Sequence, residues 1–126
     1  MKLKMITPDT ILFDGNTKRI HVAEPEGTFS ILDRHAPLLM VVKHFVLTLL
    51  TETDELTYIA AGAGVLKVLN NEVSLIVDYG AVGASKEQAK TNLAHLKEEI
   101  IQRRTHLGDD TIANLELELM RMTQNL

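Results

Sequence analysis

Three histidines, His21, His35 and His44, are the side chains of this sequence best suited to bind a metal ion. Imidazoles from different strands of a β-sandwich could converge on one metal. However, no two histidines have the i, i+2 spacing that places both on one face of a strand, and neither H-x-H nor H-E-x-x-H occurs. We interpret them as surface or hydrogen-bonded histidines and expect no metal cofactor. A stand-alone ligand- or metal-binding β-sandwich stays open as the alternative reading.

The Gly62-Ala63-Gly64 segment is a second candidate, because closely spaced glycines can form a loop around a phosphate group. Such a loop needs a strand before it, a helix after it, and usually a lysine or a further glycine. Here a strand-like segment that begins at Val65 follows the glycines. The pattern therefore predicts a glycine-kinked turn between two strands.

Pairs of acidic and basic side chains are the third candidate. Asp33 and His35 are close in sequence, and Glu24 and Glu26 flank a proline. General acid–base catalysis needs carboxylates with shifted pKa values in a pocket, and nothing in these segments marks one. Ser30 is not in a G-x-S-x-G motif. We therefore expect a protein that is not an enzyme.

The composition of the 126-residue chain excludes further classes of functional site and of binding partner. The absence of cysteine excludes disulfides, thiolate metal sites and a cysteine nucleophile. A net charge of −4 argues against nucleic-acid binding, which normally uses a basic face. No apolar run reaches the roughly 18 residues needed to cross a bilayer, and the first residues lack the apolar core of a signal peptide. We expect a soluble protein that reaches a membrane only through a partner.

The first two thirds of the sequence have the pattern of short strands. Apolar and polar residues alternate in segments separated by turn residues at intervals of about 8–12 residues, which is typical of an antiparallel sandwich or barrel. Residues 14–16 (DGN) are a strong turn signal, and residues 51–55 and 69–72 resemble hairpin tips. The expected strands cover residues 2–6, 11–13, 18–23, 28–32, 37–42, 45–51, 56–61, 65–69 and 73–77.

The pattern becomes helical after Gly83. Ser85 is a candidate N-cap, and Gln88, three residues later, can complete a capping box. The helix that follows has its apolar residues on one face and is expected to end near Gly108, which suits a left-handed C-cap. Those apolar residues are Ala89, Leu93, Leu96 and Ile100.

A second helix is expected after Asp109 or Asp110, either of which can cap it. The short connection makes the two helices antiparallel neighbours. We therefore predict the α+β class, with an N-terminal antiparallel β-sandwich domain at residues 1–83 and a C-terminal antiparallel helical hairpin at residues 84–126. The apolar face of the second helix would contain Ile112, Leu115, Leu119 and Met122.

Residues 26–39 (EGTFSILDRHAPLL) resemble the most recognisable segment of the epsilon subunits of F-type rotary ATP synthases, roughly E-G-x-x-G-I-x-P-x-H-A-P-L-L. The resemblance extends in order along the whole chain. It includes residues 4–9 (KMITPD), 12–15 (LFDG), 58–68 (YIAAGAGVLKV) and 70–73 (NNEV).

The resemblance implies a subunit of the central stalk. Its sandwich would lie at the foot of the gamma subunit and beside the ring of c subunits, on the cytoplasmic face of a bacterial cell membrane, and would help to transmit rotation. The hairpin of such subunits can extend toward the alpha/beta hexamer and inhibit ATP hydrolysis. The coupling ion, proton or sodium, stays open. The resemblance places partner contacts at Glu26, Gly27, Thr28, Phe29, Arg34, His35, Ala36, Pro37 and Leu38.

Several positions depart from the family pattern. The family usually has glycine at the position of Ser30, proline at Asp33 and often glycine at Arg34. Members that bind ATP have an acidic residue and an arginine where this chain has Ser85 and Gln88, so we expect no bound ATP and no other cofactor.

The segment from residue 109 onward contains four acidic residues and one arginine. The family's inhibition uses basic residues that meet an acidic segment of the beta subunit, so like charges would repel here. We therefore expect only weak inhibition of ATP hydrolysis by this hairpin.

Overall fold

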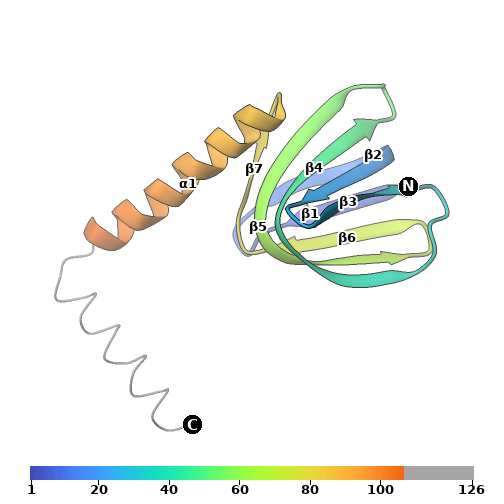
Figure 1. The fold of residues 1–126 in the computed structure, drawn as a ribbon, viewed down its shortest axis with the longest axis horizontal. Coiled ribbons are helices and arrows are strands. Elements are labelled where there is room, and N and C mark those ends of the chain that lie inside the picture. The colour runs from blue at the N-terminus through green and yellow to red at the C-terminus, as the bar shows by residue number, and fades with distance from the viewer. Residues whose placement is uncertain (107–126) are drawn as a thin grey trace, which may run out of the picture. The chain divides into compact units, whose positions relative to one another are not determined.

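The computed structural model describes residues 1–106, and within them the chain forms seven strands followed by one helix (Figure 1). The elements are β1 (Lys2–Ile6), β2 (Ile11–Glu24), β3 (Gly27–Leu32), β4 (Leu38–Thr51), β5 (Leu56–Leu69), β6 (Glu72–Val77), β7 (Gly80–Gly83) and α1 (Lys86–His106). The class predicted from sequence, a β-sandwich followed by helix, is confirmed for this part of the chain.

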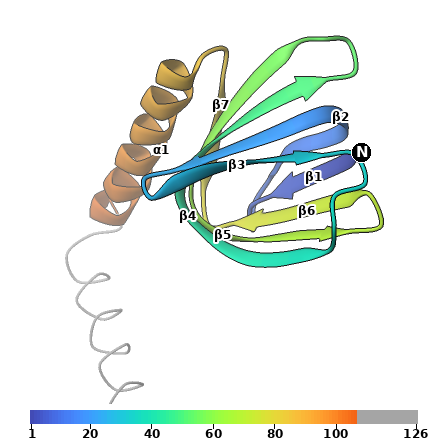
Figure 2. The ribbon, with the colours of Figure 1, turned by 45° about the vertical axis from the view of Figure 1, so that its right-hand side comes forward.

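The strands form a closed sandwich. Their order is β1-β6-β5-β4-β2-β3, β7 pairs with β5, and an additional β1–β2 pairing closes the ring (Figure 2). The long strands β2, β4 and β5 each contribute to both layers. Layer A consists of β1, β6 and residues 11–16, 38–43 and 63–69 of the long strands. Layer B consists of β3, β7 and residues 17–24, 45–51 and 56–61.

The predicted turn at Gly62-Ala63-Gly64 is wrong, because β5 runs through these residues without interruption. The strand passes from one layer to the other here, and His44 on the neighbouring β4 has a φ of 47° and interrupts the pairing. A Cβ built on Gly62 would be 2.6 Å from Oδ1 of Asp78. Glycine at residue 62 therefore leaves room for the side chains of Asp78 and Tyr79 beside a continuous strand.

The prediction of a turn at residues 14–16 (DGN) is also wrong. These residues continue β2 and pair with β1, with Leu3 opposite Gly15. Pairing with a neighbouring strand overrides the local turn preference of the three residues. Two further features were not predicted: the short strand β7, and the parallel pairing of β1 with β6.

Both predicted hairpin tips are confirmed. Asn70 and Asn71 have φ values of 52° and 61° between the paired residues Leu69 and Glu72, as expected for a two-residue hairpin loop with a right-handed twist. At the other tip, the backbone N–H of Asp54 donates to the carbonyl oxygen of Thr51 at 3.0 Å.

The space between the layers is filled mainly by aliphatic side chains. On each strand, alternate residues point inward, and Phe45 is the largest of the fully buried side chains. The other large ones are Leu3, Met5, Ile20, Ile31, Leu47, Leu49, Ile59, Leu66, Leu75, Val22 and Val42. Because β2, β4 and β5 contribute to both layers, this core joins the two layers.

The N-cap predicted at Ser85 is confirmed, and Gln88 closes the cap as predicted, but by accepting from the residue before the N-cap. The backbone N–H of Gln88 donates to Oγ of Ser85 at 3.1 Å, and the N–H of Ala84 donates to Oε1 of Gln88 at 3.1 Å. By internal contacts the chain divides into two units, Met1–Leu93 and Ala94–Leu126. The domain boundary after Gly83 stays a prediction. The C-cap at Gly108 and the second helix lie outside the described residues.

Candidate functional site

Seven of the nine residues predicted to contact partners form two groups, at opposite ends of β3. Glu26 is in the turn between β2 and β3 and Gly27 is the first residue of β3, whereas residues 34–37 connect β3 to Leu38, the first residue of β4. The six residues of β3 span about 17 Å between the groups. Thr28 is exposed and Phe29 packs partly against the core. The residues therefore form two separate surfaces, and their contact with partners stays a prediction.

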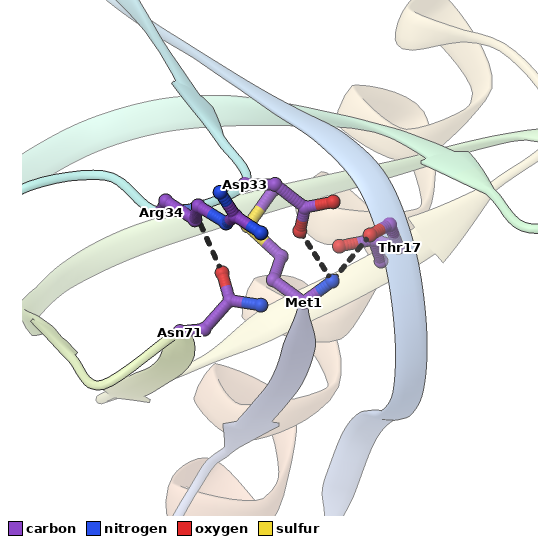
Figure 3. A network of polar contacts seen from close by, with 5 residues as sticks. All are labelled: Met1, Thr17, Asp33, Arg34 and Asn71. Atoms are coloured by element: carbon purple, nitrogen blue, oxygen red, sulfur yellow. Dashed lines mark hydrogen bonds and ion pairs between the residues drawn. The ribbon is translucent and has the colours of Figure 1, made fainter.

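The turn after β3 is fixed by a small polar network (Figure 3). The N–H of His35 donates to the carbonyl oxygen of Leu32 at 3.2 Å, and the N–H of Arg34 donates to Oδ1 of Asn71 at 2.9 Å. The ammonium group of Met1 is 2.8 Å from Oδ1 of Asp33. These contacts join the turn to the start of β1 and to the β5–β6 hairpin.

Arg34 has a φ of 63°, a left-handed conformation that costs a residue with a Cβ about 1 kcal/mol. We expect Arg34→Gly to raise the free energy of unfolding by about 0.5–1 kcal/mol, because glycine adopts this conformation without strain. Arg34→Ala is the matched control, since it removes the side chain but keeps the Cβ. Urea unfolding measures both, and equal stabilities of the two variants would contradict a strained backbone at residue 34.

The Met1 ammonium, which bonds Oδ1 of Asp33, holds the pKa of that carboxyl below its ordinary value of 3.8. Because the pKa of Asp33 is lower in the folded chain than in the unfolded chain, its carboxylate stabilises the fold at pH values above the unfolded-state pKa. This stabilisation is lost as the pH falls through the folded-state pKa. We therefore expect Asp33→Asn to flatten the loss of stability below about pH 4. NMR titration of the unaltered chain should give an Asp33 midpoint under 3.8. Acetylation of the amino terminus should raise this midpoint toward the ordinary value, although Asn71 and Arg34 still lower it; an unchanged midpoint would exclude the ammonium as a cause.

The outer face of layer A contains a row of five exposed or half-exposed β-branched side chains, which we name the apolar row: Ile11, Ile6, Ile76, Val65 and Val41. Each lies opposite the next across adjacent strands, from β2 through β1, β6 and β5 to β4. Ile11 is 59% exposed, Ile76 56% and Val41 61%. Their neighbours along the strands, Met5, Leu66, Leu75 and Val42, point inward and are fully buried.

Hollows and charges border the apolar row. At the β4 end, a shallow hollow of about 300 Å³ is lined by Pro37, Leu38, Leu39, Lys67, Val68 and Leu69. Leu39 there is 71% exposed. In the next row of the same face, Lys67 and Lys4 lie on either side of Ser74. An apolar centre with a polar border is the usual composition of a protein–protein interface.

The histidines lie in different parts of the described sandwich. Nδ1 of His21 is 2.9 Å from Oγ of Ser30 on the outer face of layer B. Nδ1 of His35 is 2.8 Å from the carbonyl oxygen of Ala36 in the turn after β3. His44 is exposed at the bend of β4. Among residues 1–106, no three His, Asp or Glu side chains come together as metal ligands would.

The apolar row was not predicted from the sequence, although a signal for it exists. Residues 75–77 (LIV), 41–42 (VV) and 65–66 (VL) are apolar without alternation, whereas a strand with one face in water should alternate. Runs of this kind indicate a strand that is covered on both faces. Among residues 1–106, Ile76, Val65 and Val41 on the second face are exposed instead.

In the part of the chain that the structure describes, an aliphatic sandwich with an exposed apolar row has the composition of a protein-docking module. The family model for the β-sandwich domain of the ATP synthase delta/epsilon chain matches residues 1–82. The chain therefore belongs to the epsilon-chain family of F-type ATP synthases, and it is a non-catalytic subunit.

Individual relatives agree with this family. The ATP synthase epsilon chain of Sulfurovum sp. (strain NBC37-1) is 32% identical over 99 residues, which cover 79% of this chain and 75% of the relative. The epsilon chain of Prochloron didemni is 31% identical over 126 residues, 98% of this chain and 87% of the relative.

Two solved structures share the fold. A chain of the Euglena gracilis mitochondrial ATP synthase (OSCP/F1/c-ring) superposes with a TM-score of 0.60 at 16% identity, covering 90% of this chain and 71% of that one. A chain of the Tetrahymena thermophila mitochondrial ATP synthase (central stalk/c-ring) gives 0.53 at 20% identity, covering 63% of each. In residues 1–106, no helix has the length and apolar character needed to span a bilayer.

Proposed function

We propose that this chain is a central-stalk rotor subunit that couples rotation of the c ring to the gamma subunit and the catalytic head. The observation that carries the proposal is the apolar row on layer A. Five β-branched side chains exposed across five strands are unfavourable in water and are expected to be covered in the working assembly. The closed sandwich behind the row supplies the stiffness that torque transmission requires.

We assign the apolar row to the gamma subunit. The hollow beside it, which Pro37 and Leu38 help to line, suits an apolar anchor residue of the partner. A large apolar contact gives a long-lived interface, which two subunits that rotate together need. Lys67 at the border of the row then favours an acidic residue on gamma, whereas Lys4 has Asp14 opposite it on β2.

We assign the β2–β3 hairpin tip to the c ring. Glu26 and Thr28 are exposed there, and the tip is short and braced, since the N–H of Lys43 donates to Oε2 of Glu24 at 3.3 Å. A polar tip on a rigid scaffold is suited to contact the polar loops of a ring. The two groups of predicted contact residues then serve two partners.

We also propose that the isolated chain does not bind ATP. Oγ of Ser85 and Oε1 of Gln88 accept backbone hydrogen bonds of the helix cap, and neither side chain is charged. A triphosphate would have no guanidinium partner at these positions. Calorimetry with ATP and magnesium should detect no binding, and one-site micromolar binding would contradict this proposal.

The remaining parts of the function concern location and control. The chain is proposed to be peripheral, on the cytoplasmic face of a bacterial membrane, held there by the ring and gamma. The hairpin is proposed to inhibit ATP hydrolysis only weakly, through its contact with the alpha/beta hexamer. The coupling ion depends on the ring.

Co-purification tests the proposed function. A tagged copy of the full chain, expressed in the organism that encodes it, should bring down gamma, c, alpha and beta subunits after mild detergent extraction. Isolation of the tagged chain alone, with a bound small molecule or stoichiometric metal, would instead favour the alternative of a stand-alone ligand-binding sandwich.

A further inference from the structure

The junction between β7 and α1 is packed more closely than a flexible linker would be. A Cβ built on Gly83 would overlap the backbone nitrogen of Ala89 and lie 2.7 Å from its Cα. Ala89 itself is fully buried, on the first turn of the helix. The helix backbone therefore rests directly on the backbone of the last strand, and only glycine at residue 83 allows this approach.

Hydrogen bonds before and after Ala89 also hold the start of the helix against β7. Before it, the capping box joins Ala84 and Ser85 to Gln88. One turn after it, Nδ2 of Asn92 donates to the carbonyl oxygen of Val82 at 2.9 Å. The bond from Asn92 joins the second turn of the helix to β7 itself, so the contact extends beyond the cap.

The strand under the helix is itself fixed to the core of the sandwich. β7 pairs with β5, with Ala60 opposite Ala81 and Ala61 opposite Gly80. Ala60 and Ala61 are almost fully buried, although alternate residues of an isolated strand point to opposite faces. Both faces of β5 are therefore covered at this point.

From these contacts we propose that residues 84–93, which we name the clasp, are a permanent part of the β domain. Any rearrangement of the helical part would then start beyond Leu93, inside α1, and not at the Gly83–Ser85 junction where the sequence places the boundary. The inference depends only on packing within Met1–Leu93, so it does not rest on the proposed partners.

Thiol labelling of the full chain tests the clasp directly, because the natural sequence has no cysteine to interfere. Ala89→Cys reports on the buried contact, and Lys90→Cys, its exposed neighbour, is the matched control. We expect maleimide to label Cys at 89 at least about tenfold more slowly than Cys at 90. Equal labelling rates in a folded chain would overturn the proposal.

A second substitution in the cysteine variants tests whether the contact between Gly83 and Ala89 holds the helix. Adding Gly83→Ala should bring the labelling rate at 89 close to that at 90, because the new Cβ separates the helix from β7. Gly27→Ala, where an added Cβ meets nothing within 4 Å, should leave both rates unchanged. Unchanged labelling at 89 in the Gly83→Ala chain would show that this contact does not hold the helix.

Amide hydrogen exchange on the unaltered chain provides a test that needs no substitution. If residues 89–93 belong to the β domain, their amides should exchange at least about tenfold more slowly than those of residues 98–102 in the same helix. Uniform exchange along α1 would indicate a helix that opens as one unit, which contradicts the clasp.

Discussion

Replacing Val65 by Asp and Ile76 by Lys together is expected to weaken binding of the chain to the gamma subunit by at least about a hundredfold, or about 2.7 kcal/mol. The two residues lie opposite each other on β5 and β6, at the centre of the apolar row. In the complex their charges would be removed from water against apolar surface, which costs more than their mutual attraction returns. Titration calorimetry with purified gamma measures the change.

The fold should tolerate this double change. Val65 is 45% exposed and Ile76 is 56% exposed, so urea unfolding should shift by less than about 1 kcal/mol. Leu56→Asp is the matched control, since Leu56 is 49% exposed but belongs to layer B. It should change affinity less than about threefold. Equal losses of affinity from both faces would contradict the assignment of the apolar row to gamma.

Gly64→Ala is expected to lower the free energy of unfolding by about 2–4 kcal/mol, the largest stability effect that we predict. A Cβ at this position would overlap the carbonyl oxygen of Ile76 and lie 2.6 Å from Cγ1 of Val77. The backbone of β6 cannot move away, because β6 pairs with β1 on its other side. The strand pairing must therefore open where β5 passes between the layers.

Gly15→Ala is the matched control for this prediction. Gly15 is also a strand glycine, but an added Cβ would lie 3.5 Å from the ring of Phe13, an ordinary contact. Its substitution should change stability by less than about 1 kcal/mol. Similar losses from the two glycines in thermal or urea unfolding would mean that strand propensity, and not the close approach at Gly64, sets the cost.

Most elements, though not β7, were predictable in type because their signals are local. Alternation in β1, the asparagine pair at the β5–β6 tip and the cap of α1 depend on residues a few positions apart. The continuity of β2, β4 and β5 was not predictable from such signals. Glycines and turn-forming residues inside these strands serve long-range pairing, for example Gly15 opposite Leu3.

The candidate site shows the same division between local and long-range information. The segment around Pro37 could be found by its resemblance to a family. The apolar row could not, since its five members come from five strands and become neighbours only through the register of the sheet. A single sequence contains the unbroken apolar runs, but it does not state which strands lie side by side.

Site-specific photo-crosslinking in the assembled enzyme shows whether the apolar row contacts the gamma subunit. A photoreactive amino acid at residue 65, on the apolar row, should form an adduct with the gamma subunit in membranes that contain the complete complex. The same group at residue 56, on the opposite layer and similarly exposed, should form none with gamma. Absence of a gamma adduct from residue 65, or an equal yield from residue 56, would mean that the apolar row is not the surface that binds gamma.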